Sequence, residues 1–181
     1  PGIPPSLSVQ TIQEGEPGEL WIGAWGTGVV RYRPASRESQ IYELPDNRIY
    51  VLNTQEKDFI RAGTWGGGGY VIDLKANTIA SYRSSKALGT LPNDVVYSIF
   101  QDQSGELWVG TNGGGVARRD RTRRSFTAYV ADTNDPTAIP NGKIIASLVD
   151  SRGILWVSVY SGGVHSLVPG TRTWNHYRHD P

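Results

Sequence analysis

The chain has 181 residues and a net charge of +1, from 18 basic and 17 acidic side chains, and it contains no cysteine. This balance favours neither nucleic acid nor direct membrane contact, and the lack of cysteine excludes disulfides and thiolate-bound metals. No apolar run reaches the roughly 18 residues that a membrane-spanning helix needs.

A glycine-rich stretch occurs four times along the chain. Its copies read GELWIGAWGTGV, DFIRAGTWGGGG, GELWVGTNGGGV and GILWVSVYSGGV. Their anchor residues, roughly 40 to 48 residues apart, are Trp21, Arg61, Trp108 and Trp156. Each anchor is followed at one fixed distance by a glycine and at another by a tyrosine, the residues being Gly28, Gly68, Gly115 and Gly163, and Tyr42, Tyr82, Tyr129 and Tyr177. A constant interior with variable connectors indicates tandem structural modules.

Four modules are predicted in chain order, at about residues 6–43, 47–83, 94–130 and 142–178, so that residues 1–181 form one segment. The first lacks an aspartate in its first turn, and the second has Arg61 where the others have tryptophan. The third module is the most regular and predicts short strands at about 95–100, 107–111, 116–119 and 126–130. No stretch has a helical period. The sequence therefore predicts an all-β chain of four tandem, four-stranded antiparallel blades, which are part or half of a larger β-propeller.

The second strand of each module is predicted to pack blade against blade. Its bulky anchor fills the gap between blades, and the small residue two positions later lets the next blade approach. These predicted core residues are Trp21, Gly23, Arg61, Gly63, Trp108, Gly110, Trp156 and Ser158. For Arg61 we expect a guanidinium that stacks on a ring and keeps its charge in solvent.

The repeat resembles the two-component regulator propeller repeat. The third module carries the resemblance through Asp102, Gly105 and Trp108, and the fourth through Asp150 and Trp156. This resemblance implies a seven-bladed propeller in the periplasmic sensor region of bacterial hybrid histidine kinases, many of which are tied to oligosaccharide uptake. Kinase activity would then belong to downstream domains, and the location would be periplasmic or extracytoplasmic.

One turn position is predicted to face a ligand. Four residues after each anchor stand Trp25, Trp65, Asn112 and Tyr160, in the turn between the second and third strands. Aromatic faces together with amide and hydroxyl groups suit a sugar. The alternative is that these side chains pack on neighbouring turns or contact a protein.

Little in the sequence predicts catalysis, and no catalytic residue, cofactor or metal is assigned. The three histidines, His165, His176 and His179, are expected to be exposed. Asp102 and Asp150 are interpreted as turn formers, because one carboxylate per turn is too few for calcium. A basic run is interpreted as a solvated hairpin rather than a binding patch; it comprises Arg118, Arg119, Arg121, Arg123 and Arg124.

The leading hypothesis is a non-catalytic sensory module that binds a saccharide or a protein partner. An alternative is a fragment of a propeller-type lyase or glycosidase, and a third is a purely structural, self-associating blade array. Four blades would leave an apolar face at each end of an open arc. We therefore expect either self-association or further blades from the same protein.

Overall fold

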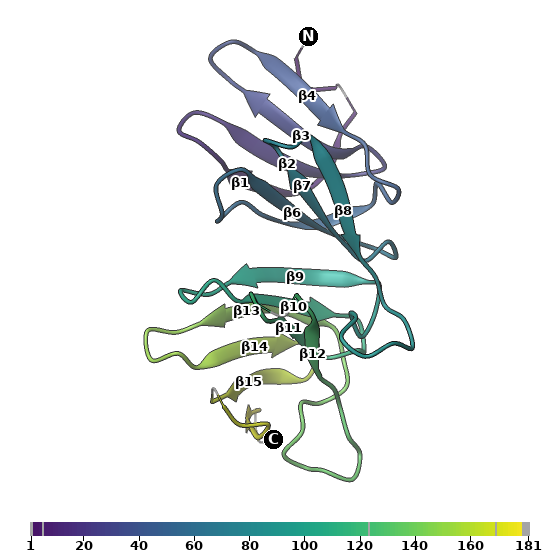
Figure 1. The fold of residues 1–181 in the computed structure, drawn as a ribbon, viewed down its shortest axis with the longest axis vertical. Helices are drawn as coiled ribbons and strands as arrows, with labels where there is room; N and C mark the ends of the chain where they lie inside the picture. The colour runs from purple at the N-terminus through teal and green to yellow at the C-terminus, as the bar shows by residue number, and fades with distance from the viewer. Residues whose placement is uncertain (1, 5, 123, 169, 179–181) are drawn as a thin grey trace.

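The computed structural model describes residues 2–4, 6–122, 124–168 and 170–178. These residues form four separate four-stranded antiparallel sheets, which follow one another from the N-terminus to the C-terminus (Figure 1). The sheets do not close into a ring. The predicted all-β fold of a partial propeller is confirmed. Among the described residues there is no helix that is long and apolar enough to cross a bilayer.

Each blade uses four consecutive strands in chain order. Blade 1 contains β1 (Ser8–Glu14), β2 (Leu20–Trp25), β3 (Gly28–Arg33) and β4 (Glu38–Tyr42). Blade 2 contains β5 (Ile49–Asn53), β6 (Phe59–Thr64), β7 (Gly69–Asp73) and β8 (Thr78–Tyr82). Blade 3 contains β9 (Val96–Gln101), β10 (Leu107–Thr111), β11 (Val116–Arg119) and β12 (Phe126–Tyr129). Blade 4 contains β13 (Ile144–Val149), β14 (Leu155–Val159), β15 (Gly163–Leu167) and β16 (Trp174–Tyr177).

The glycine and tyrosine that recur after each anchor meet in space. Gly68 and Gly115 have φ angles of 78° and 75°, which favour glycine. A Cβ atom on either residue would lie 2.1 Å from the backbone carbonyl oxygen of Tyr82 or Tyr129. The constant spacing in the sequence thus reflects a close approach between the turn after the second strand and the end of the fourth strand.

The blades pack through a contact that repeats at each internal interface. A Cβ atom added to Gly23 would lie 2.7 Å from a methyl group of Ile49, in the first strand of the next blade. The corresponding distances are 2.5 Å from Gly63 to Val96 and 2.6 Å from Gly110 to Ile144. Ser158 occupies the same position in blade 4, which is the last blade that the described residues form. Small residues in β2, β6 and β10 therefore allow the first strands β1, β5, β9 and β13 to contact one another in succession.

The tryptophan anchors each donate a hydrogen bond to a carboxylate in their own blade. The indole N–H of Trp108 donates to Asp102 at 2.8 Å, and that of Trp156 donates to Asp150 at 3.0 Å. In blade 1, which lacks the turn aspartate, Glu19 accepts from Trp21 at 2.9 Å. Trp21 and Trp108 are buried, whereas Trp156, in the last blade, is only half-buried.

Arg61 differs from our expectation. Its side chain is buried, at 8% exposure, and it pairs with Glu56 rather than keeping its charge in solvent. Burial alone would raise the pKa of Glu56, but the hydrogen bond and the charge of Arg61 lower it. The prediction of a solvated guanidinium is wrong because the preceding turn supplies a carboxylate that neutralises it.

The prediction of exposed imidazoles is also wrong for His165, which is fully buried. Its Nδ1 lies 2.8 Å from Nδ1 of His176, and its Nε2 lies 3.0 Å from the carbonyl oxygen of Gly162. Burial lowers the pKa of His165, so the neutral ring is favoured. His179 lies outside the described residues. No group of three or more metal-ligating side chains occurs in the described part of the chain.

Candidate functional site

Aromatic side chains from three blades gather at one end of the second strands. The ring centroids of Trp25 and Trp65 are 5.8 Å apart, and Tyr50 lies 5.5 Å from the first and 5.3 Å from the second. Tyr97 extends the group, at 4.8 Å from Tyr50 and 6.3 Å from Trp65. Tilted and edge-on rings at these separations form a continuous aromatic cluster.

Blade 4 adds a cation and another ring to this aromatic cluster. The Nζ atom of Lys143 lies 5.9 Å from the ring centroid of Tyr97 and 5.5 Å from that of Tyr160. An ammonium group at such distances is attracted to both rings. Tyr160 is 63% exposed and Trp25 is 37% exposed, so the cluster can be reached from solvent at both of its ends.

Backbone hydrogen bonds hold the aromatic turns in place. The amides of Trp65, Asn112 and Tyr160 donate to the carbonyl groups of Arg48, Val95 and Lys143, each just before the first strand of the same blade. The turns of blades 1 and 3 are also joined to the next blade. The backbone amide of Gly26 donates to the carbonyl oxygen of Asn47, and that of Gly113 donates to the carbonyl oxygen of Gly142. The site is therefore built on rigid strand ends rather than on free loops.

The structure places the four predicted ligand-facing residues at this end, but not in one contact group. Trp25 and Trp65 contact each other directly, and Tyr160 joins through Lys143. Asn112 is half-buried and forms a β-bridge with Lys143. Sequence reasoning missed Tyr50, Tyr97 and Lys143. An alignment of the first strands would have shown the two tyrosines, because each follows the β-branched residue that packs on the preceding blade.

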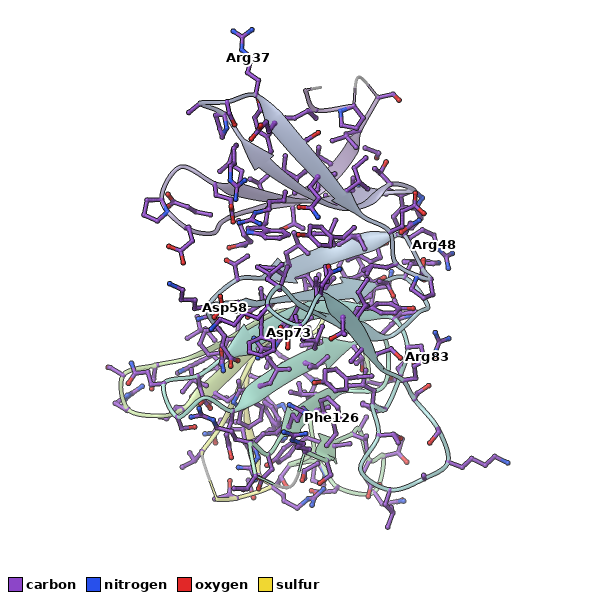
Figure 2. The ribbon with its side chains drawn as sticks, turned by 45° about the horizontal axis from the view of Figure 1, so that its top comes forward. Arg37, Arg48, Asp58, Asp73, Arg83 and Phe126 are labelled. Atoms are coloured by element: carbon purple, nitrogen blue, oxygen red, sulfur yellow. The ribbon has the colours of Figure 1, made fainter. Side chains whose placement is uncertain are left out.

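Charged groups at the rim of the aromatic cluster are already paired. Arg48 contacts Asp46 at 2.8 Å, and Arg83 lies 3.8 Å from Asp94. Figure 2 shows Arg48 and Arg83 on one side of the molecule and Asp58 on the other. Burial and the neighbouring hydroxyl of Tyr97 raise the pKa of Tyr50, so its hydroxyl keeps its proton near neutral pH. The cluster can therefore offer flat apolar faces, tyrosine hydroxyls and the ammonium group of Lys143 to a ligand.

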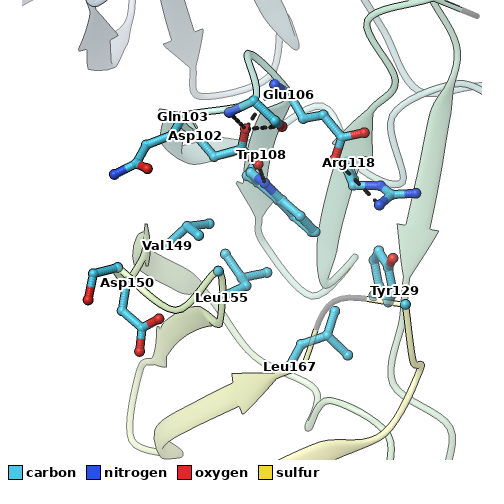
Figure 3. Close-up of a pocket in the computed structure, with 14 residues that line it drawn as sticks. Asp102, Gln103, Glu106, Trp108, Arg118, Tyr129, Val149, Asp150, Leu155 and Leu167 are labelled. Carbon is cyan, nitrogen blue, oxygen red and sulfur yellow. Dashed lines mark hydrogen bonds and ion pairs between the residues drawn. The ribbon is translucent and has the colours of Figure 1, made fainter.

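A cavity of about 300 Å³ lies between blades 3 and 4, at the end of the strands opposite to the aromatic cluster (Figure 3). Val149, Leu155 and Leu167 give it an apolar wall. Its carboxylates already have partners, since Asp102 accepts from Trp108 and Glu106 pairs with Arg118 at 3.4 Å. Burial raises the pKa of Glu106. The carboxylates of this cavity therefore serve contacts within the blades. Arg118 keeps one buried Nε atom without a hydrogen-bond partner among the described residues, but it is the only arginine in the lining, and we assign the cavity no ligand.

Comparison with known proteins identifies the repeat. Residues 90–113 match the model of the family described as two component regulator propeller. The matched segment comprises the end of the connector before blade 3 and the first two strands of that blade. The resemblance noted in the sequence is thereby confirmed, and the match covers the turn Asp102–Gly105 and the anchor Trp108 of this repeat. No curated protein matches the chain.

Solved structures with the same fold include extracellular domains of bacterial signalling systems. The extracellular domain of BT3049, assigned to a hybrid two component system of B. thetaiotaomicron, superposes with a TM-score of 0.76 and 18% identity over 96% of this chain. The extracellular domain of BT4673 from the same organism gives a TM-score of 0.74 and 20% identity over 93% of this chain. PorZ of Porphyromonas gingivalis, a component of the type-IX secretion system, gives 0.63 and 19% over 94%. The chain spans only 22% of each of the two extracellular domains and 26% of the PorZ chain.

Proposed function

We propose that this chain is a non-catalytic sensory segment of a regulator propeller that lies outside the cytoplasm and binds a saccharide. The two component regulator propeller repeat and the extracellular regulator domains among the similar structures support the sensory role. The aromatic cluster supports the ligand class. The C–H face of a sugar stacks on rings such as Trp25 and Tyr160, while its hydroxyl groups bond to tyrosine hydroxyls and to Lys143.

A glycan array, followed by calorimetry on any glycan that binds, tests this proposal. We expect Trp25→Ala and Tyr160→Ala each to weaken binding about fivefold, because one stacked ring contributes roughly 1 kcal/mol. Ile79→Ala is the matched control, since Ile79 is an exposed apolar residue on β8 away from the cluster. If the chain binds no glycan on the array but does bind a protein of the same sensory system, the ligand is a protein partner and the saccharide proposal is wrong.

Incubation with bulk polysaccharide separates the sensor from a lyase or glycosidase. The sensory proposal expects the polysaccharide to be recovered uncleaved, with no new reducing or unsaturated ends. Time-dependent product release that is lost in Trp25→Ala would instead favour the enzyme.

The ends of the array support a second proposal, that isolated chains pair head to tail. Val9 holds the same register position on its first strand as Ile49 and Ile144 hold on theirs. Ile49 and Ile144 are buried against the preceding blade, whereas Val9 is 44% exposed. At the other end Ser158 stands where Gly23, Gly63 and Gly110 receive the next blade. Each end therefore offers one half of the internal contact, and a second copy supplies the other half when flanking blades are absent.

Light scattering at micromolar concentration measures this pairing. The wild-type chain is expected to be a dimer or larger. Val9→Asp is expected to be a monomer, because burying an unpaired carboxylate against the blade that carries Ser158 is unfavourable. Ile79→Asp, which changes an exposed residue outside both ends, should leave the mass unchanged. A monomeric wild-type chain would rule out head-to-tail pairing and leave the ligand site of the aromatic cluster untouched.

A further inference from the structure

We propose that the cavity between blades 2 and 3 binds a tetrahedral oxyanion, the sulfate or phosphate group of a ligand. The cavity has a volume of about 450 Å³ and lies at the end of β6 opposite to the aromatic cluster. It is independent of the proposed saccharide site. Four arginines line it, namely Arg61, Arg119, Arg121 and Arg124.

The deepest of these arginines carries an unused donor. Arg61 is 8% exposed, and its Nη2 atom pairs with Glu56. Its Nη1 atom is buried and has no hydrogen-bond partner among the described residues. A buried guanidinium N–H without an acceptor costs free energy, and an oxyanion in the cavity would satisfy it.

Arg119 presents a second unused donor to the same cavity from blade 3. Its guanidinium carbon lies 4.8 Å from the ring centroid of Tyr82, a cation–π contact that holds the group at the cavity wall. Its Nε atom is also buried without a hydrogen-bond partner in the described part of the chain. The two unsatisfied donors come from different blades, so one oxyanion in the cavity between the blades could accept from both.

The charge around the cavity is unbalanced. Arg121 and Arg124 lie on the hairpin between β11 and β12, and neither forms an ion pair with a described carboxylate. The cavity contains two carboxylates, Glu56 and Asp73, against four guanidinium groups. Asp73 already accepts hydrogen bonds from the backbone amides of the next turn. Since guanidinium groups match the oxygens of sulfate and phosphate, the excess positive charge favours an oxyanion.

Two irregular features of the sequence meet in this cavity. The first is the arginine at the anchor of blade 2, where the other three blades have tryptophan. The second is the basic run of blade 3, for which the sequence pattern predicts a solvated hairpin. Arg119, Arg121 and Arg124 of that run line the cavity with Arg61, whereas Arg118 turns to the other side of its strand and pairs with Glu106.

Titration with sodium sulfate and with sodium phosphate, each against sodium chloride at equal ionic strength, tests the proposal. Two-dimensional NMR of the arginine Nε–Hε groups and thermal unfolding give separate readouts. We expect a saturable shift of the Arg119 Nε–Hε signal and a saturable rise in Tm with at least one of the two oxyanions. Saturation by one alone would tell a sulfate group from a phosphate group as the source. Shifts that do not saturate, or that chloride reproduces, would reflect screening and overturn the proposal.

Arg61→Trp is the most informative variant, because it restores the anchor of the other blades and leaves Glu56 as an acceptor for the indole N–H. We expect it to fold and to bind the oxyanion at least tenfold more weakly. Arg119→Gln, which keeps Arg61 paired, should weaken binding to a similar degree and serves if Arg61→Trp does not fold. Lys86→Gln, which removes an exposed cation from a connector outside the cavity, is the control. Unchanged affinity in both arginine variants would place the oxyanion elsewhere and contradict the assignment.

Discussion

Blades 2 and 3 place different chemistry at the same point of the same fold. In blade 3 the indole of Trp108 is buried and donates a hydrogen bond to Asp102, a side chain of the preceding turn. In blade 2 a charged pair, Arg61 with Glu56, occupies the equivalent place. Both arrangements join a donor on the second strand to a carboxylate of the first turn. Both blades thus keep this link, whereas the donor differs between them and with it the surface that each blade presents.

The largest expected effect comes from breaking the link in blade 2. Glu56→Ala should lower the free energy of unfolding by about 3 kcal/mol, because it leaves the buried guanidinium of Arg61 without its counter-ion. Urea denaturation at pH 7 measures the change. Glu56→Gln, which keeps an acceptor in place, should lose less, and an equal loss in both variants would show that the charge of the pair is not what matters.

Breaking the link in blade 3 should have a smaller effect, of about 2 kcal/mol. Asp102→Ala leaves the indole N–H of Trp108 unpaired and also removes the acceptor for the amides of Ser104 and Glu106. Asp102→Asn retains the acceptor oxygen and is the matched control. We expect the unfolding free energy to fall more in Glu56→Ala, because that variant buries an unpaired charge. A larger fall in Asp102→Ala would contradict this order.

Acid should weaken both links, and blade 3 allows the effect to be isolated. Burial alone would raise the pKa of Asp102, but hydrogen bonds from Ser104 and Trp108 lower it below its ordinary value of 3.8. A carboxyl group with a lowered folded-state pKa binds protons more readily in the unfolded chain. Its contribution to stability is therefore complete above about pH 4 and is lost as the pH falls through the folded-state pKa.

Unfolding free energies measured from pH 6 to pH 2.5 check this expectation. The wild-type chain should lose stability below about pH 4, and Asp102→Asn should show a shallower decline because its side chain does not titrate. Equal slopes for the two proteins would show that other carboxyl groups govern acid unfolding.

Blade 1 has both a tryptophan and an arginine that donate to one carboxylate, and removing the arginine should lower the unfolding free energy least. Glu19 accepts from the indole of Trp21 and also from Arg31 at 2.6 Å, and the guanidinium of Arg31 lies 5.4 Å from the indole centroid. Arg31→Gln should cost about 1 kcal/mol, since Glu19 keeps its bond to Trp21 and the arginine is partly exposed. Urea denaturation of the wild type and of Arg31→Gln measures this cost. The difference between their unfolding free energies should be smaller in high salt than in low salt.

The sequence alone determined the blades. The anchor, the glycine after it and the tyrosine beyond form a local pattern, because strand, turn and strand follow one another along the chain and meet within one sheet. The close contact of Gly115 with the carbonyl of Tyr129 explains why their spacing is constant. The turn role of Asp102 was likewise readable, since its hydrogen bonds reach only a few residues ahead. The aromatic turn position was visible for the same reason.

Only the tertiary structure decided which side chains from different blades share a site. Tyr50 and Tyr97 lie between or beside the predicted tryptophans because the first strands of successive blades pack together, and Lys143 connects Tyr160 to them. The same packing brings Arg119 to the cavity of Arg61 and buries a charge that we expected in solvent. A repeat pattern carries information about contacts within a unit. Contacts between units depend on how the blades pack, and in this protein that packing forms both the aromatic cluster and the arginine cavity.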